Sequence, residues 1–204
     1  MDQAKTHVYF MPGLAAGPKT FKKLKLNKDK FKCHYLSWIN PLDLEESIEN
    51  YARRLSKKIT HKKPVLVGVS FGGILVQEIS KHIDTQKIII ISSVKNSSEL
   101  PTSFAIASKS KIYKLFPTRI ITNFDNYAKF FIGTKLQKKA KLYKKYLSVR
   151  DEKYLKWALE NVINWQQEKS IKNTIHLHGT NDEIFPFKNI KNCISIQDAN
   201  HSMI

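Results

Sequence analysis

The stretch "LVGVSFGG", residues 66–73, places Ser70 between Gly68 and Gly72 at the end of an apolar run. The residues before Ser70 have the pattern of a buried strand, and those after it continue with helical spacing. A serine lifted clear of a sheet on such a turn has a strained backbone, and the residues two before and two after it must be small. The stretch therefore predicts a nucleophile at Ser70. The alternative is a tight connection in which Ser70 only caps the following helix.

The rest of the chain alternates between strand and helix signals. Apolar or alternating segments predict strands at 6–11, 31–38, 64–70, 87–93, 174–179 and 193–199. An amphipathic helix is expected over 43–59, with Asp43 as its N-cap and Glu46 completing a capping box. Strands that alternate with helices need crossover connections and therefore pair in parallel. The predicted fold class is α/β, a mostly parallel six-stranded sheet with helices on both faces, in a single domain spanning 1–204.

A long segment, residues 95–170, carries no strand signal and is predicted to form a helical lid inserted after the fourth strand. Its aromatic residues could line an apolar acyl pocket, or they could simply pack between the lid and the core. They are Phe104, Tyr113, Phe116, Phe124, Tyr127, Phe130, Phe131, Trp157 and Trp165. The sequence leaves both interpretations open.

The strand, the glycine-flanked serine and the helix together resemble the nucleophile elbow of the α/β-hydrolase fold family, most closely its small bacterial-type serine hydrolases. In that family the acid and then the histidine follow the nucleophile along the chain. "HGTNDEIFP", 178–186, resembles the acid loop and implies Asp182, with Glu183 as the neighbouring alternative. "DANHSMI", 198–204, places His201 where the family has its base. The resemblance thus implies a Ser70–His201–Asp182 triad.

An oxyanion hole is implied by the same resemblance. "MPGLAAG", 11–17, is similar to the family's oxyanion loop, with Pro12 in place of the usual histidine. The two backbone donors would be the N–H groups of Phe71 and Leu14, with Ala15 as the reserve for Leu14. Since the backbone makes these contacts, the side chains are a poor test of the assignment.

The remaining histidines fit the position of the base less well. Three precede the elbow, one lies in the helix behind it, and two alternate within a strand: His7, His34, His61, His82, His176 and His178, in chain order. The last two would need a third ligand to hold zinc, and none is evident nearby. We therefore expect no metal and no cofactor.

Composition and charge limit the classes of protein to which this chain can belong. The 204 residues, 42% of them hydrophobic, can bury one core. The formal charge of +18 could attract nucleic acid or an anionic surface, but 31 of the 35 basic residues are scattered lysines, which favours a solvated surface and no specific nucleic-acid partner. No apolar run is long enough for a membrane-spanning helix, so no integral membrane association is expected. Cys33 and Cys193 are expected to be reduced, buried thiols of a cytoplasmic protein, a disulfide being the lesser alternative.

The predicted function is hydrolysis of a small-molecule carboxylic ester or thioester through an acyl-enzyme. An acyltransferase with the same triad and a non-catalytic ligand-binding module on the same fold are the alternatives. The chain ends at Ile204, where the family has a final helix, so either a shorter ending is tolerated or a natural tail is missing. The acyl group, the leaving group and the oligomeric state are left open.

Overall fold

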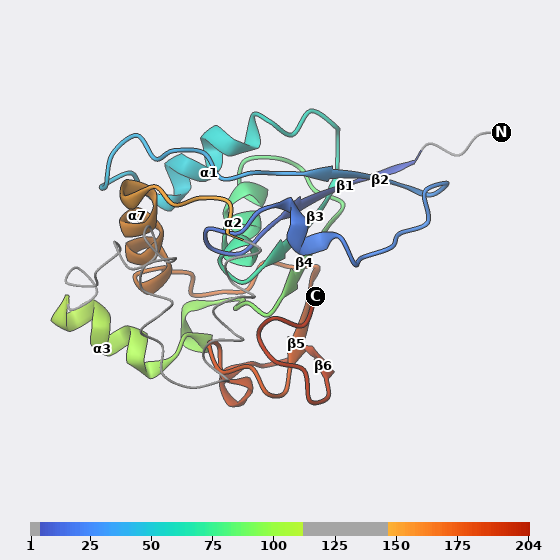
Figure 1. Cartoon of the computed structure of the whole chain (residues 1–204). Coiled ribbons are helices and arrows are strands. Elements are labelled where there is room, and N and C mark those ends of the chain that lie inside the picture. The colour runs from blue at the N-terminus through green and yellow to red at the C-terminus, as the bar shows by residue number, and fades with distance from the viewer. Residues whose placement is uncertain (1–4, 112–146) are drawn as a thin grey trace.

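A six-stranded sheet organises the chain. The computed structural model describes residues 5–111 and 147–204 (Figure 1). All strand pairs are parallel, and the spatial order is β2-β1-β3-β4-β5-β6. The strands are β1 Thr6–Met11, β2 Phe31–Tyr35, β3 Val65–Val69, β4 Lys87–Ile91, β5 Thr174–Gly179 and β6 Ile194–Ile196. Each of the six predicted strands is present, and the α/β fold class is confirmed.

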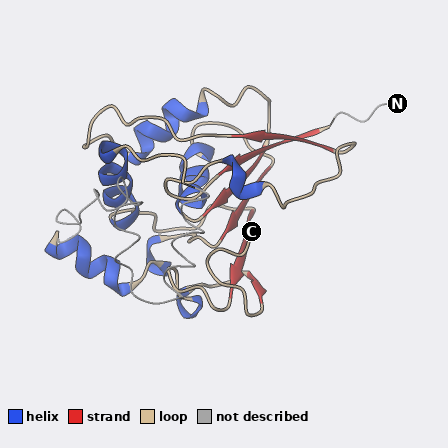
Figure 2. Ribbon diagram, viewed as in Figure 1, coloured by secondary structure: helices blue, strands red, loops and turns tan. Residues whose placement is uncertain are grey.

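Helices connect these strands within the described residues (Figure 2). The α-helices are α1 Ile48–Ser56, α2 Phe71–Ser80, α3 Thr102–Ser110 and α7 Glu152–Ile163, and the short 3₁₀ helices are η1 Pro18–Phe21, η2 Ser97–Glu99 and η5 Phe187–Asn189. No helix in the described ranges is long and apolar enough to cross a membrane.

The two faces of the sheet are covered differently. The larger buried cluster joins one face of the sheet to α1, α2 and α7, with Leu66 and Ile90 among its strand residues. The opposite face carries a smaller cluster that includes Phe10 and Val67, and η1 covers it with Phe21. Alternate residues of a strand point to opposite faces, which is why β1 and β3 each contribute to both clusters.

The start of α1 differs from the expectation. The helix begins at Ile48, and its N-cap is Ser47, whose side chain accepts a hydrogen bond from Asn50 N–H. Asp43 instead accepts from Glu45 N–H within the preceding loop. The capping-box prediction at 43–46 was therefore wrong, because Ser47 caps the same amphipathic helix about one turn later.

Helix α7 packs into the main core. Trp157 is fully buried, stacks on Tyr51 with ring centroids 4.1 Å apart, and donates its indole N–H to Glu46 O at 2.7 Å. Trp165 is also buried and donates to Glu78 Oε1. Both rings pack in the core, and Trp165 also borders a cavity of about 620 Å³ between α1 and α7.

Much of the predicted lid lies outside the described residues. Of its aromatic residues, Phe104 is partly buried against the main cluster. Tyr113, Phe116, Phe124, Tyr127, Phe130 and Phe131 lie outside the described ranges. The lid and an acyl pocket beneath it therefore stay predictions.

Both cysteines are free thiols and only partly buried. Burial raises the pKa of each. Cys33 lies on β2, and Cys193 directly precedes β6 at the opposite edge of the sheet. The disulfide alternative does not occur in this structure.

Candidate active site

Ser70 lies on a strained turn between β3 and α2. Its φ is 54° and its ψ is −125°, a conformation that costs a residue with a side chain about 1–3 kcal/mol. The turn is held by the N–H of Ser70, which donates to Ile91 O at 2.9 Å, and by Ser93 Oγ, which donates to Ser70 O at 2.8 Å. The Ser70 side chain makes no capping hydrogen bond to α2. The helix-cap alternative for Ser70 is therefore wrong.

Glycine is required at positions 68 and 72 for steric reasons. A Cβ on Gly68 would lie 2.3 Å from Gly72 O, and a Cβ on Gly72 would lie 2.3 Å from Pro12 O. Both distances are far below van der Waals contact, and the atoms that would be met are backbone. Only glycine lets the elbow and the loop after β1 approach so closely.

Three predicted side chains lie in hydrogen-bonding reach of one another. His201 Nε2 is 2.9 Å from Ser70 Oγ. On its other side, His201 Nδ1 is 3.0 Å from Asp182 Oδ1 and 2.9 Å from Asp182 Oδ2. Glu183, the alternative acid, is exposed, and the carboxylate that faces His201 is that of Asp182. The three come from the ends of β3, β5 and β6, as expected where parallel strands end at one edge.

Asp182 is held as a carboxylate. Burial raises its pKa, but this effect is outweighed by the hydrogen bond and charge of His201 and by two backbone donors, so that the pKa lies below its ordinary value. Those donors are the N–H groups of Ile184, at 2.8 Å, and Phe185, at 2.9 Å, both to Oδ1. They fix the carboxylate while it faces the imidazole.

Two buried histidines of β5 lie behind Asp182. His178 Nε2 is 3.5 Å from Asp182 Oδ2 and donates to Phe185 O at 2.8 Å, so this nitrogen carries a proton. His178 Nδ1 lies 3.1 Å from His176 Nε2. Burial, with the nearby His178 and Lys95, lowers the pKa of His176 to about 3. Both histidines are buried in the core.

The loop after β1 lies against the serine. A Cβ on Gly13 would be 3.4 Å from Ser70 Cβ. Trp38 Nε1–H donates to Gly13 O at 2.9 Å and holds the loop in place. Ala15 N–H donates to the hydroxyl of Tyr154 at 3.2 Å, and this engagement removes Ala15 as the reserve donor to an oxyanion.

Solved structures with a similar fold cover nearly the whole chain. They include an esterase from Thermogutta terrifontis (TM-score 0.60, 15% identity, 98% of this chain and 84% of that one) and the enol-lactonase from Burkholderia xenovorans LB400 (TM-score 0.62, 10% identity, 98% and 85%). A bromoperoxidase from Bacillus anthracis is also similar (TM-score 0.63, 14% identity, 98% and 86%). The chain has the α/β-hydrolase fold. In this fold Ser70 follows β3, Asp182 follows β5 and His201 follows β6.

No protein-family model matches this α/β-hydrolase-fold chain, and no curated protein matches its sequence significantly. The three similar structures carry different activities by name, an esterase, a lactonase and a bromoperoxidase. The shared fold therefore does not select the reaction, which has to be argued from the site.

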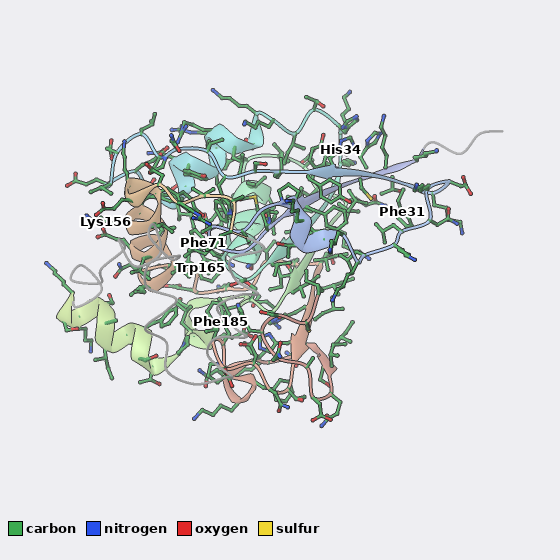
Figure 3. The ribbon with its side chains drawn as sticks, in the orientation of Figure 1. Phe31, His34, Phe71, Lys156, Trp165 and Phe185 are labelled. Carbon is green, nitrogen blue, oxygen red and sulfur yellow. The ribbon has the colours of Figure 1, made fainter. Side chains whose placement is uncertain are left out.

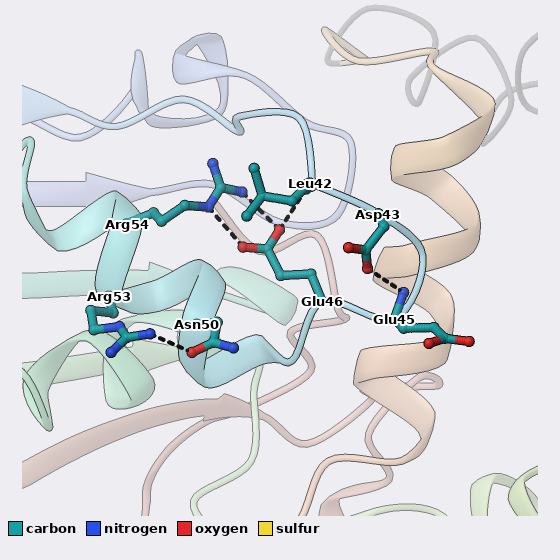
Figure 4. Close-up of a pocket in the computed structure, with 7 residues that line it drawn as sticks. All are labelled: Leu42, Asp43, Glu45, Glu46, Asn50, Arg53 and Arg54. Carbon is teal, nitrogen blue, oxygen red and sulfur yellow. Dashed lines mark hydrogen bonds and ion pairs between the residues drawn. The ribbon is translucent and has the colours of Figure 1, made fainter.

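A pocket of about 350 Å³ lies beside α1 (Figure 4). It is lined by Leu42, Asp43, Glu45, Glu46, Asn50, Arg53 and Arg54. Ser70, Asp182 and His201 do not line it. Arg54 meets the buried Glu46 carboxylate with two nitrogens, at 2.7 and 2.8 Å, and Arg53 donates to Asn50 Oδ1. Arg54 and Glu46 neutralise each other, and the side chains with triad geometry lie elsewhere, so this pocket is a poor candidate for the reaction site.

Proposed function

We propose that the protein is a serine hydrolase that cleaves a small-molecule carboxylic ester or thioester through Ser70, His201 and Asp182. The observation that carries the proposal is the continuous chain of contacts from Ser70 Oγ to His201 Nε2 and from His201 Nδ1 to Asp182, each about 2.9–3.0 Å long. An ordinary turn serine has no need of such a chain or of a strained backbone.

In the first step His201 Nε2 accepts the Ser70 hydroxyl proton as Oγ attacks the acyl carbon. Asp182 accepts the Nδ1–H hydrogen bond, which leaves Nε2 free of a proton and able to act as the base. The imidazolium that forms then lies beside a buried carboxylate, which stabilises its charge. His201 returns the proton to the departing alkoxide or thiolate, and the acyl group stays on Ser70.

The negative charge on the acyl oxygen needs donors fixed in advance. Phe71 N–H is at the first position of α2, where a helix has no internal acceptor for the group. The helix dipole adds positive potential at this end. Leu14 N–H, on the loop held by Trp38, is the second proposed donor, since Ala15 N–H is engaged by Tyr154.

In the second step water, activated by His201, attacks the acyl-enzyme and releases the acid. Replacement of this water by another nucleophile would give acyl transfer with the same residues. The distinction depends on what reaches the acyl-enzyme and not on the triad.

The test is covalent labelling. Wild type, Ser70→Ala and Ser80→Ala are exposed to a fluorophosphonate, and intact masses are measured with circular dichroism as a folding control. Ser80 lies at the far end of the same helix and gives the matched control. We expect one adduct on wild type and on Ser80→Ala and none on Ser70→Ala. A folded wild type that takes no adduct, or an adduct that persists in Ser70→Ala, refutes an activated Ser70.

A further inference from the structure

Three histidines far apart in the sequence converge at one edge of the sheet. His7 lies on β1, His34 on β2 and His61 in the connection between α1 and β3. His34 pairs in register with Tyr9, and His7 is two residues before Tyr9, so their side chains share one face. The imidazoles of His7 and His61 stack with centroids 3.5 Å apart.

We propose that His7, His34 and His61 form a binding site for a divalent transition-metal ion such as Zn²⁺. One ligand nitrogen from each residue lies within 4.8 Å of the other two. A tetrahedral Zn²⁺ with Zn–N bonds of about 2.0–2.1 Å brings neighbouring nitrogens to about 3.3 Å. His7 Nδ1 and His34 Nε2 are already 2.9 Å apart. To share an ion the His7 and His61 rings must leave their parallel stack so that their in-plane lone pairs converge, and rotation about the side-chain bonds of these partly exposed residues can supply this movement.

The contact between His7 and His34 is one that a metal ion can replace. Neutral imidazole is the form that ligates a metal. Only one proton fits between His7 Nδ1 and His34 Nε2, and an ion that binds both nitrogens displaces it.

Tyr9 orients the third ligand. Its hydroxyl lies 2.7 Å from His61 Nδ1 and accepts Thr60 N–H at 3.3 Å. When the hydroxyl also accepts a hydrogen bond from His61 Nδ1–H, Nε2 of His61 is left as the ligand atom. A hydrogen bond on the second ring nitrogen is the usual way in which a metal-binding histidine is oriented. Tyr9 is therefore a positioning residue of this site.

The donor set indicates the class of ion. Three imidazole nitrogens suit Zn²⁺, Cu²⁺, Ni²⁺ or Co²⁺ and do not suit Mg²⁺ or Ca²⁺, which prefer oxygen. The fourth position stays open to water. Nearby Lys32 opposes a cation, so the site should be weaker than a site with a carboxylate or thiolate.

The site is separate from the proposed reaction centre. His34 lies on the edge strand β2, well away from Phe71, which follows Ser70 (Figure 3). His61 precedes β3, whereas Ser70 follows it, so the two lie toward opposite ends of that strand. An ion at this site would tie β1, β2 and the α1–β3 connection together. The inference does not depend on the hydrolase proposal.

The experiment uses full-length protein without a histidine tag, freed of metal with a chelator. Zn²⁺ is titrated by calorimetry, and Co²⁺ by the intensity of its visible bands, which are strong for tetrahedral nitrogen ligation. The variants are His61→Gln and, as the matched control, His82→Gln at the end of α2. We expect one ion per wild-type chain, unchanged binding in His82→Gln, and at least a tenfold loss of affinity in His61→Gln. Zn²⁺ at 100 times its Kd should raise the wild-type Tm by about 5–10 °C.

Two further variants keep the test decisive. Tyr9→Phe should weaken Zn²⁺ binding about tenfold or more without removing a ligand, which a purely structural tyrosine would not do. His34→Gln replaces His61→Gln if the latter fails to fold by circular dichroism. Absence of saturable binding to folded wild type overturns the proposal. So does a folded His61→Gln or His34→Gln that binds Zn²⁺ as tightly as His82→Gln.

Discussion

We expect His176 to make the stability of the protein sensitive to acid. It is 2% exposed on β5, and its pKa falls from 6.5 to about 3, chiefly through burial, with contributions from His178 and Lys95 that outweigh the opposite effect of Asp182. The folded pKa lies below the unfolded one, so the unfolded chain takes up a proton that the native protein excludes. The contribution of neutral His176 to the free energy of unfolding is fully present above pH 6.5 and is lost as the pH falls toward 3.

The magnitude follows from the size of the shift. At pH 5 the solution is about 1.5 pH units below the unfolded pKa of His176, so this side chain is protonated in the unfolded chain. In the folded protein the ring is still neutral at this pH. At about 1.36 kcal/mol per unit, the free energy of unfolding falls by roughly 2 kcal/mol between pH 7 and pH 5 from this group alone. His176→Gln removes the titration and keeps an amide that can hydrogen-bond to His178.

The assay is urea unfolding at pH 7 and pH 5 of wild type, His176→Gln and His82→Gln. The loss of stability on acidification should be roughly 2 kcal/mol smaller in His176→Gln than in wild type and unchanged in His82→Gln. An identical pH dependence in wild type and His176→Gln refutes the reasoning. So does a wild-type His176 ring that titrates by NMR with a midpoint near pH 6.

Two predictions concern the elbow and the proposed triad. Asp182→Asn leaves a hydrogen-bond partner for His201 but no longer selects the Nδ1–H tautomer. We therefore expect kcat for any ester that the protein cleaves to fall by about 10⁴ while the protein stays folded. A loss of less than tenfold would contradict the role of Asp182 as the acid. Gly72→Ala places a Cβ 2.3 Å from Pro12 O, and we expect the free energy of unfolding measured in urea to fall by about 2–4 kcal/mol. The Cβ of Gly17→Ala meets only the Ser148 side chain, so this control should lose less stability. Equal costs for the two glycines would show that the backbone approach at Gly72 relaxes easily.

The elements of the fold could be read from local patterns. Short apolar segments such as 87–93 mark buried strands because parallel strands are covered on both faces. The turn glycines could be assigned because a serine at φ 54° forces small neighbours, and that requirement is local. The start of α1 could not be fixed, since Asp43 and Ser47 are both good caps. In the structure Ser47 caps the helix, and Glu46, which the capping box needed, pairs with Arg54 instead.

What the sequence determined by itself about this protein is the order of the strands along the chain, the elbow at Ser70 and the two loops that carry Asp182 and His201. Chain order and motif spacing suffice for these because each depends on a few adjacent residues. Only the tertiary structure decided which side chains meet: that His201 reaches Ser70, that Tyr154 engages Ala15 N–H, and that three separated histidines converge. The register and spatial order of strands set such contacts, and these depend on packing between segments that local patterns do not encode.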